Sequence, residues 1–306
     1  MKRSAKICLC VSAAIMVLAL ILSICGLGVN YGIDFAGGLT MSYKMNSSFE
    51  VADVNAAIDS LGFSGYQVSK AGDAQTELQI RVPTLDSEDS VQEFQNNLTA
   101  ILTEKYTEMD TENVNVSYVG PVAGRTLVSN AIWSVILASV LMLVYIAFRF
   151  DFCSGLSAVI GLVHDVLMML AFMVLLRSII QMNSSFIAAM LTIVGYSINN
   201  TIVIFDRIRE NRKLHANEMS MTDITSLSVK QSLGRTINTT LTTLLTMVAL
   251  YVLGVNSIRE FALPIIIGIL SGVYSANMIN GYVWAFLEDK IGGKKLFGAK
   301  KAKKKA

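Results

Sequence analysis

A histidine and an aspartate stand next to each other, as His164 and Asp165, inside a long apolar run of this 306-residue chain. Counted from Ser154 to Leu176, Asp165 is the twelfth of 23 residues, so it would lie at the middle of a membrane-spanning helix. Ionisable side chains are costly at that depth, and they usually face the interior of a helix bundle and mark a route for ions or protons. We therefore expect a functional role for this pair. The alternative is a hydrogen bond that only locks helix packing.

Two amides, Asn199 and Asn200, lie in the next apolar run, close to its charged end. Asn200 precedes Asp206 by six residues, which is ~9 Å along a helix axis. An amide donates and accepts hydrogen bonds, so it can hold a water molecule or link two helices at ~0.6–2 kcal/mol. It has no titratable proton, so it cannot bind and release protons as a carboxylate does.

A polar stripe follows one face of the fifth apolar run. Its members recur at three- and four-residue steps, which places them on one side of a helix: Arg235, Asn238, Thr239, Thr242, Thr243 and Thr246. Threonine hydroxyls can bond their own backbone carbonyls, which is the structural alternative. Arg235 begins the run and could extend its guanidinium to the membrane surface. Six polar positions on one face favour a hydrated seam between helices.

Six apolar runs are long enough to cross a hydrocarbon core of ~30 Å, which takes roughly 20 helical residues. They cover residues 7–29, 130–148, 154–176, 185–205, 236–255 and 261–287. The chain is 53% hydrophobic and 16% charged, whereas about 25% of the residues of soluble domains are charged. The sequence therefore predicts an α-helical polytopic membrane protein. The last run also carries small residues at four-residue spacing, a surface that allows close helix contact: Gly268, Ser271, Gly272, Ser275 and Ala276.

The distribution of Lys and Arg predicts the orientation. If the N-terminus is cytoplasmic, the cytoplasmic parts hold 18 of the 25 basic residues, and the two short outer loops hold one each. This agrees with the rule that short cytoplasmic loops are rich in Lys and Arg. We expect the first run to be an uncleaved anchor. The predicted domains are 1–29 (cytoplasmic tail and first helix), 30–129 (exported domain), 130–287 (five helices, with a cytoplasmic loop at 206–235) and 288–306 (basic cytoplasmic tail).

Segment 30–129 has the pattern of a small α/β domain. It holds 14 acidic and 5 basic residues. Alternating residues predict four strands, and apolar faces at helical spacing predict two helices. In chain order these are strand 39–45, helix 50–61, strands 66–70 and 76–83, helix 86–106 and strand 114–120. The order β-α-β-β-α-β is the ferredoxin-like arrangement.

The same segment carries no arrangement of side chains suited to catalysis. It contains no histidine, and neither a nucleophile–base pair nor a carboxylate pair stands out in it, so we expect a binding or mechanical domain and no enzyme. The four cysteines lie outside it, and no Cys/His spacing in the chain indicates a metal site. We expect no cofactor. The lysine-rich end predicts contact with anionic lipid, and nucleic acid is not an expected partner.

Five motifs resemble those of the SecF branch of the SecD/SecF family of bacterial protein-export subunits. They are GIDFAGG (32–38), GPVAG (120–124), LVHDVL (162–167), VGYSINNTIVIFDRIREN (194–211) and RTINTTLTT (235–243). They follow the family's order along nearly the whole chain, so the set is more specific than any one motif. The resemblance assigns two groups of residues: Gly32, Asp34, Gly37 and Gly38 after the first helix, and Asp206, Arg207 and Arg209 at the cytoplasmic end of the fourth.

The resemblance implies a non-enzymatic subunit of the Sec translocase. The family belongs to the RND-type superfamily, whose transport unit consists of two six-helix halves, so this chain would supply one half and SecD the other. The pair would associate with the SecYEG channel, with YajC as a further candidate partner, and use the proton-motive force to draw exported unfolded polypeptide outward. The implied location is the bacterial cell membrane, with both termini cytoplasmic and residues 30–129 outside.

Asn200 departs from the family pattern. The family usually carries an aspartate at that position, implicated in proton conduction together with the position of Arg235. The expected ion pathway comprises His164, Asp165, Asn199, Asn200, Arg235 and Thr239. Its carboxylate would come from Asp165 or from SecD, and its ion would be a proton or sodium. Two other readings stay open, which are an RND-type exporter half for small molecules or lipids and a scaffold whose polar seam only packs helices.

Overall fold

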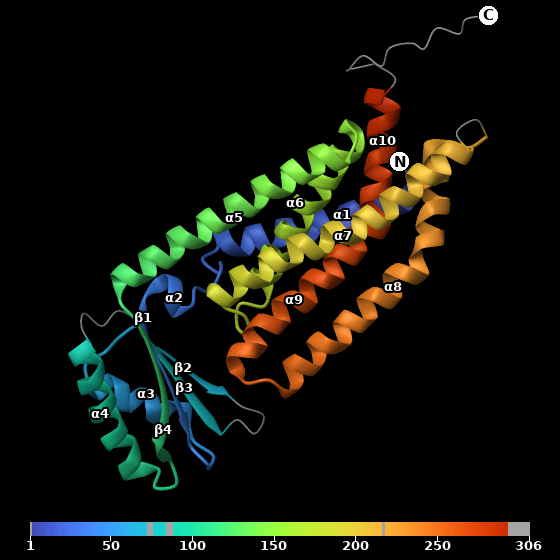
Figure 1. Ribbon diagram of the computed structural model, residues 1–306. Helices are drawn as coiled ribbons and strands as arrows, with labels where there is room; N and C mark the ends of the chain where they lie inside the picture. The colour runs from blue at the N-terminus through green and yellow to red at the C-terminus, as the bar shows by residue number, and fades with distance from the viewer. Residues whose placement is uncertain (1, 72–75, 84–87, 216–217, 293–306) are drawn as a thin grey trace, which may run out of the picture. The chain divides into compact units, whose positions relative to one another are not determined.

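The computed structural model describes residues 2–71, 76–83, 88–215 and 218–292 (Figure 1). Within these residues, six helices are long and apolar enough to cross a membrane, as predicted. The first five are α1 (Arg3–Ile24), α5 (Pro121–Arg149), α6 (Phe152–Leu175), α7 (Ser184–His215) and α8 (Met221–Leu253). The sixth runs through α9 (Asn256–Ser275), the π-helical turn η1 (Ala276–Asn280), α10 (Gly281–Leu287) and a second π-helical turn, η2 (Glu288–Gly292).

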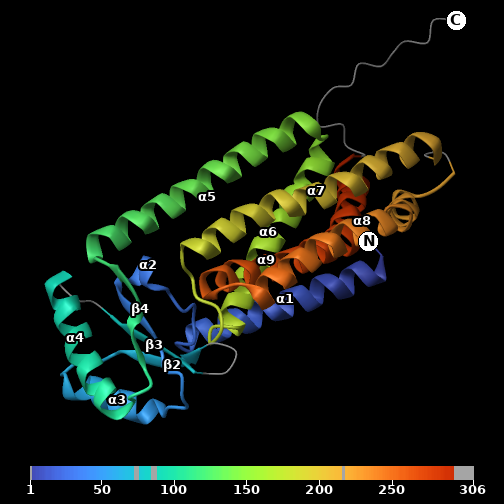
Figure 2. The same cartoon turned by 60° about the horizontal axis from the view of Figure 1, so that its bottom comes forward.

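The larger of two compact units covers residues 1–30, 135–181 and 185–306 and holds the membrane helices except for the first part of α5, which belongs to the smaller unit. Within it α6 packs against both α1 and α9, and α8 packs against α9 (Figure 2). Helix α1 ends at Ile24, five residues before its predicted end, because Gly26 takes a positive φ of 82° and the Leu27 N–H turns back to the Leu22 carbonyl at 2.9 Å. Glycine tolerates this conformation at a helix end without strain.

Helices α7 and α8 extend beyond the predicted spans. Helix α7 continues to His215 and α8 begins at Met221, so most of the predicted loop at 206–235 is helical, and only residues 216–220 separate the two helices. The extension of α7 is rich in Arg, Glu and Lys, which favour helix even in water. Ser220 caps α8 by accepting a hydrogen bond from the Asp223 backbone N–H at 3.2 Å. An apolar run marks only the part of a helix that can lie in lipid. That part is shorter than the whole helix.

The smaller unit comprises Tyr31–Ser134 and Met182–Ser184. It begins with the short helix α2 (Ile33–Ala36). It continues in the predicted β-α-β-β-α-β order with β1 (Gly38–Lys44), α3 (Val51–Ser60), β2 (Gln67–Ala71), β3 (Glu77–Val82), α4 (Glu88–Lys105) and β4 (Asp110–Val119). The four strands form one sheet in the order β2-β3-β1-β4, and every neighbouring pair is antiparallel.

Alternation along the strands builds the core of this unit. Every second residue of β1 and β3 is buried and packs against α3 and α4, which lie on the same face of the sheet (Figure 1). A fully buried Leu, Ile, Met or Phe side chain stabilises the fold by about 1.5–3 kcal/mol compared with the same side chain exposed to water. The largest fully buried side chains of this core are Leu39, Met41, Tyr43, Met45, Phe49, Ile58, Leu78, Ile80 and Leu98.

An ion pair ties the two helices of the smaller unit together. The Lys105 ammonium lies 2.8 Å from the Asp53 carboxylate, and the Tyr106 hydroxyl donates to Asp53 Oδ2 at 2.9 Å. Lys105 first, and Tyr106 second, hold the pKa of Asp53 below its ordinary value, while the carboxylate raises the pKa of Lys105. Because the pKa of Asp53 is lowered in the folded state, the pair's contribution is present at neutral pH and is lost as the pH falls through that lowered pKa.

The first two residues of the predicted helix 86–106 and the lysine-rich end from residue 293 onward lie outside the described residues.

Candidate functional site

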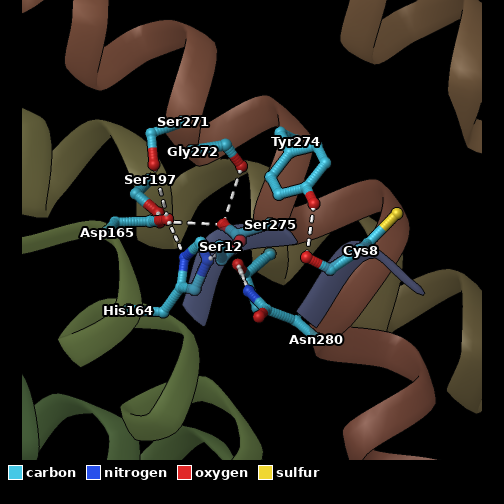
Figure 3. Close-up of polar contacts among 11 residues, drawn as sticks. Cys8, Ser12, His164, Asp165, Ser197, Ser271, Gly272, Tyr274, Ser275 and Asn280 are labelled. Carbon is cyan, nitrogen blue, oxygen red and sulfur yellow. Dashed lines mark hydrogen bonds and ion pairs between the residues drawn. The ribbon is translucent and has the colours of Figure 1, made fainter. Parts of the chain in front are cut away.

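His164 and Asp165 lie in the interior of the larger unit, as their depth in the third apolar run predicts. Their exposed fractions are 7% and 2%. Polar side chains from three other helices, α1, α7 and α9, surround the pair on α6 (Figure 3). We call this group the Asp165 centre; it consists of Ser12, His164, Asp165, Ser197, Ser271, Tyr274 and Ser275.

Four polar groups converge on the Asp165 carboxylate. Its Oδ1 lies 2.9 Å from His164 Nδ1 and accepts from the Ser271 hydroxyl at 3.2 Å. Its Oδ2 accepts from the Ser275 hydroxyl at 2.8 Å and from the Ser197 hydroxyl. A buried carboxyl group is costly unless its oxygens are hydrogen-bonded, and both oxygens of Asp165 have hydrogen-bond partners.

The other ring nitrogen of His164 connects the centre to α1. His164 Nε2 lies 2.8 Å from the Ser12 hydroxyl, and Ser12 is only 2% exposed. On α9, the Tyr274 hydroxyl donates to the Cys8 carbonyl at 2.7 Å, and its ring centroid lies 6.3 Å from that of His164. The first helix therefore contributes directly to the centre, which the sequence analysis did not predict.

Residue spacing explains how the helices deliver these side chains. Ser271 and Ser275 are four residues apart on α9, so they share one face. Ser12 lies on the inward face of α1 together with the buried alanines Ala5 and Ala19. A Cβ at Gly272 of α9 would lie 3.2 Å from Ser197 Cβ, so the glycine is what lets α7 approach closely. Small residues at such contacts are the usual means of close helix packing in membranes.

A second buried polar cluster surrounds Asn280 at the end of the η1 turn. Asn280 Nδ2 donates to the Thr201 hydroxyl at 2.9 Å, and its backbone carbonyl accepts from the Ser157 hydroxyl at 2.6 Å. Gly161 of α6 faces the Asn280 side chain so closely that a Cβ there would overlap it. A π-helical turn widens the helix locally and is frequent at functional sites.

The structure separates the two amides of the fourth run. Asn199 is exposed, whereas Asn200 is 3% exposed, and its Nδ2 has no hydrogen-bond partner among the residues described. Among the residues that the structure describes, no hydrogen bond joins the Asn199 or Asn200 side chain to Asp165. Within this chain alone, Asn200 is thus a buried donor outside the Asp165 centre.

The predicted polar stripe lies on the outer side of α8. Arg235 and Thr239 are exposed, and the Thr239 hydroxyl donates to the Arg235 carbonyl at 2.9 Å. The hydroxyls of Thr242, Thr243 and Thr246 bond backbone carbonyls three or four residues earlier in the same way. The stripe is therefore mostly exposed in this chain, although Thr243 is half-buried and its hydroxyl accepts from the Tyr196 hydroxyl of α7 at 3.5 Å. A hydrated seam along the stripe stays a prediction.

The inward face of α8 carries a different polar set. Ser232, Thr236 and Thr240 recur every fourth residue and are buried, and the Thr236 and Thr240 hydroxyls have no partner within the described residues. Periodicity identified a polar face of α8 but did not predict which face points inward.

The glycine motif after the first run forms a tight turn in the smaller unit. Gly37 and Gly38 have positive φ of 75° and 120°, which other residues rarely adopt. Asp34 Oδ2 accepts the Ser184 backbone N–H at 2.8 Å, and the Gly32 N–H donates to the Met182 carbonyl at 2.9 Å. These bonds join two segments of the smaller unit that are distant in the sequence.

Charged residues at the end of α7 form a partly exposed cluster. Arg149 Nη2 donates to both Asp206 oxygens, at 2.9 and 2.8 Å, and Arg209 lies 3.5 Å from the same carboxylate. Arg207 instead bonds Gln231 at 2.7 Å and Glu210 at 2.5 Å. Exposed pairs of this kind contribute little, about 0–1 kcal/mol each. Their arrangement links α7 to α5 and α8.

Six helices long and apolar enough to cross a membrane, four of which contribute to the buried polar centre at Asp165, define a multi-pass membrane protein. The family model of the protein-export membrane proteins SecD/SecF, C-terminal part, matches residues 99–290, and the SecD/SecF GG motif matches residues 22–48. The chain belongs to the SecD/SecF family, and it is a protein translocase subunit.

Relatives named SecF resemble nearly the whole chain. The protein translocase subunit SecF of Rickettsia felis is 34% identical over 268 residues, covering 87% of this chain and 85% of that protein. The SecF of Gemmatimonas aurantiaca is 34% identical over 85% of this chain and 78% of its own length. The crystal structure of SecDF from Thermus thermophilus, a translocon-associated membrane protein, matches 94% of this chain with a TM-score of 0.78 and 32% identity. The chain spans only 39% of that SecDF chain.

Proposed function

We propose that this chain is the SecF half of an ion-driven export device that works with SecD to assist passage of preproteins through SecYEG. The observation that carries the proposal is the Asp165 centre, a buried carboxyl group in the middle of an apolar run that is contacted by four side chains from three helices. Carboxylates at that depth are costly and characteristically belong to ion or proton relays. The chain spans 39% of the solved SecDF chain, and SecD would supply the other half of the device.

The orientation follows from the distribution of basic residues. Both termini are cytoplasmic, and the smaller unit, which we assign to the ferredoxin-like fold, lies outside the membrane with its excess of acidic residues. The lysine-rich tail then faces the anionic lipids of the inner leaflet, where each charge contributes about 1 kcal/mol. YajC and the exported unfolded polypeptide are the further partners of this proposal.

Ion movement drives the device through the membrane potential. One charge that crosses 100 mV releases ~2.3 kcal/mol. An ion shifts a conformational equilibrium only if the two states bind it differently. The four donors around Asp165 come from helices that pack on one another, so protonation of the carboxylate would weaken contacts to α7 and α9 together. The outer domain would follow such a change in helix packing.

The remaining pathway residues belong to the surface that SecD covers. Arg235, Thr239 and Asn199 are exposed in this chain, yet they lie in segments apolar enough to cross a membrane. An arginine and an amide facing lipid are costly, so a partner helix is their natural neighbour. With Asn200 neutral, the carboxylates of the coupled pair are Asp165 and an acid of SecD.

Co-purification tests the proposal against an exporter of small molecules or lipids. We expect the tagged chain, extracted in mild detergent from its native membrane, to retain SecD and SecYEG. Secretion in cells that depend on this chain should fall when a protonophore collapses the gradient. An RND-type exporter would assemble without the Sec channel, so purification free of SecD and SecYEG, with secretion unchanged on depletion of the chain, would refute the proposal.

Asn200→Asp restores the acid that the family usually carries, and we expect export to continue at a normal or raised rate. The carboxylate replaces a side chain of nearly equal size at a position whose Nδ2 has no partner in the described residues. The measurement is secretion with and without a protonophore, at matched membrane levels. Asn200→Leu is the control, since it has similar volume and no polar group. Complete loss of export in Asn200→Asp would contradict the expectation.

A further inference from the structure

The short helix α2 of the smaller unit holds the first residue of a membrane helix, α7. The Ser184 backbone N–H, with which α7 begins, donates to Asp34 Oδ2 at 2.8 Å. The first four N–H groups of a helix have no partner within that helix, so the Asp34 carboxylate caps α7 from a distant segment. Directly before α7, the Met182 carbonyl accepts from the Gly32 N–H at 2.9 Å. One side-chain bond and one backbone bond thus fix the start of α7 to α2.

The first turn of α5 lies against the same short helix. Gly124 of α5 is buried, and a Cβ there would lie 3.5 Å from the Asp34 carbonyl oxygen and 3.6 Å from the Gly37 nitrogen. The two glycine motifs GIDFAGG and GPVAG therefore meet at α2. We call this group the α2 clamp; it consists of Gly32, Asp34, Gly37, Gly124, Met182 and Ser184, all within the smaller unit.

Both helices that begin at the α2 clamp continue into the larger unit. The boundary between the units falls after Ser134 in α5 and after Ser184 in α7. Helix α7 reaches the Asp165 centre at Ser197, which is ~20 Å further along the helix axis. At the other end of the clamp, Gly37 and Gly38 join α2 to β1, the strand that pairs with both β3 and β4. An unbroken chain of contacts therefore runs from Asp165 to the sheet.

We propose that the α2 clamp passes movement of α7 to the sheet of the smaller unit, with Asp34 as the positioning residue that holds the start of α7. The inference rests on the proposed function and adds to it the link between the Asp165 centre and the outer domain. Protonation of Asp165 weakens its bond from the Ser197 hydroxyl, which frees α7 to shift against α6. With the clamp intact, the start of α7 moves β1 with it. With the clamp broken, the same shift leaves the sheet where it is.

The test breaks the clamp from both sides in cells that depend on this chain. Asp34→Leu removes the acceptor, and Ser184→Pro removes the donor while keeping α7, because proline is favoured at the first position of a helix. We expect both variants to lose most of the difference between secretion with and without a protonophore, at matched membrane levels. Secretion that persists with the protonophore should stay unchanged.

Two further variants separate the clamp from a general effect of charge or shape. Asp34→Asn keeps an oxygen that can accept from the Ser184 N–H, so it should retain the gradient-driven part of secretion. Asp59→Leu is the matched control, because Asp59 is an exposed acid of the same unit that lies in α3, outside the clamp, and accepts from the Tyr66 hydroxyl at 2.7 Å.

A disulfide between the two segments provides a reversible rescue. A Cβ at Gly32 would lie 3.0 Å from the Asn183 Cβ, close to the ~3.5–4.5 Å that a disulfide requires. In the Asp34→Leu variant, Gly32→Cys together with Asn183→Cys should restore gradient-driven secretion on oxidation and lose it again on reduction. The four free cysteines are first replaced by alanine, so that only the designed pair can form: Cys8, Cys10, Cys25 and Cys153.

The outcomes separate this inference from the proposed function. If Asp165→Asn removes the gradient response while Asp34→Leu and Ser184→Pro keep it, the clamp is wrong and the proposed function stands. If Asp165→Asn keeps the response, the proposed function fails and the clamp with it. Should Asp34→Leu not accumulate, Ser184→Pro decides, because it leaves the Asp34 side chain in place. Equal loss of secretion with and without the protonophore, or loss of SecD on purification, would indicate a purely structural role and overturn the inference.

Discussion

Asp165→Asn is expected to remove most of the increase in protein secretion that the ion gradient produces. The amide has nearly the same shape as the carboxylate but carries no charge and accepts fewer hydrogen bonds, whereas four groups now converge on the two oxygens. One charge moved through 100 mV is worth ~2.3 kcal/mol, a bias of about 50-fold between two states. The measurement is the rate of secretion with and without a protonophore.

Asp223→Asn provides the matched control for this prediction. Asp223 lies exposed in the first turn of α8 and pairs with the Ser220 hydroxyl at 2.6 Å, outside the Asp165 centre. The Asp223→Asn variant removes one carboxylate group, as Asp165→Asn does. A difference in secretion between the two variants therefore reports on the position of the carboxylate rather than on net charge. A wild-type response to the gradient in Asp165→Asn, at normal membrane levels, would show that the charge is structural.

Gly161→Ala is expected to destabilise the larger unit by about 1–3 kcal/mol, the usual cost of overpacking a core. The added Cβ would overlap the Asn280 side chain, which is 1% exposed and donates to the Thr201 hydroxyl at 2.9 Å. Asn280 would have to leave its position and break that bond. The measurement is the midpoint of unfolding of the purified chain in detergent.

Gly195→Ala is the matched control for the packing effect. Gly195 lies within α7, and a Cβ there meets no atom within 4 Å. The same substitution in an open helix position should stabilise by up to about 1 kcal/mol, because alanine favours helix over glycine. Combining Gly161→Ala with Asn280→Ala removes the overlap, so the double variant should lose less than the sum of the two single losses. Equal unfolding midpoints for Gly161→Ala and Gly195→Ala would refute the proposed contact.

The α8 stripe shows where sequence reasoning is limited. Six polar residues at helical spacing correctly identify one face of α8, but exposure and hydrogen bonding place that face outward in this chain. The period of a pattern determines which residues share a face. Which face turns inward depends on the neighbouring helices, and in a membrane the usual contrast between polar outside and apolar inside is absent because lipid is itself apolar.

Ser12 and Tyr274 belong to the Asp165 centre, but no pattern in the sequence indicates them. A single serine in an apolar run has no periodic partner, and a tyrosine with its largely apolar ring does not interrupt such a run, so neither residue stands out in the sequence. Ser271 and Ser275 were predicted only as small residues for helix contact. Their hydroxyls acquire a role because α9 packs against α6 at the level of Asp165.

The sequence by itself determined the six apolar helices, the order of strands and helices in the smaller unit, and the interior position of His164 and Asp165. These follow from local rules, since apolar length, alternation and the cost of a charge in lipid act on each segment separately. Only the tertiary structure decided which hydroxyls bind the carboxylate, that α1 belongs to the centre, and that α8 turns its predicted stripe away. Those contacts join residues as far apart as Ser12 and His164. Such contacts depend on how helix surfaces fit together, a property that no single segment contains.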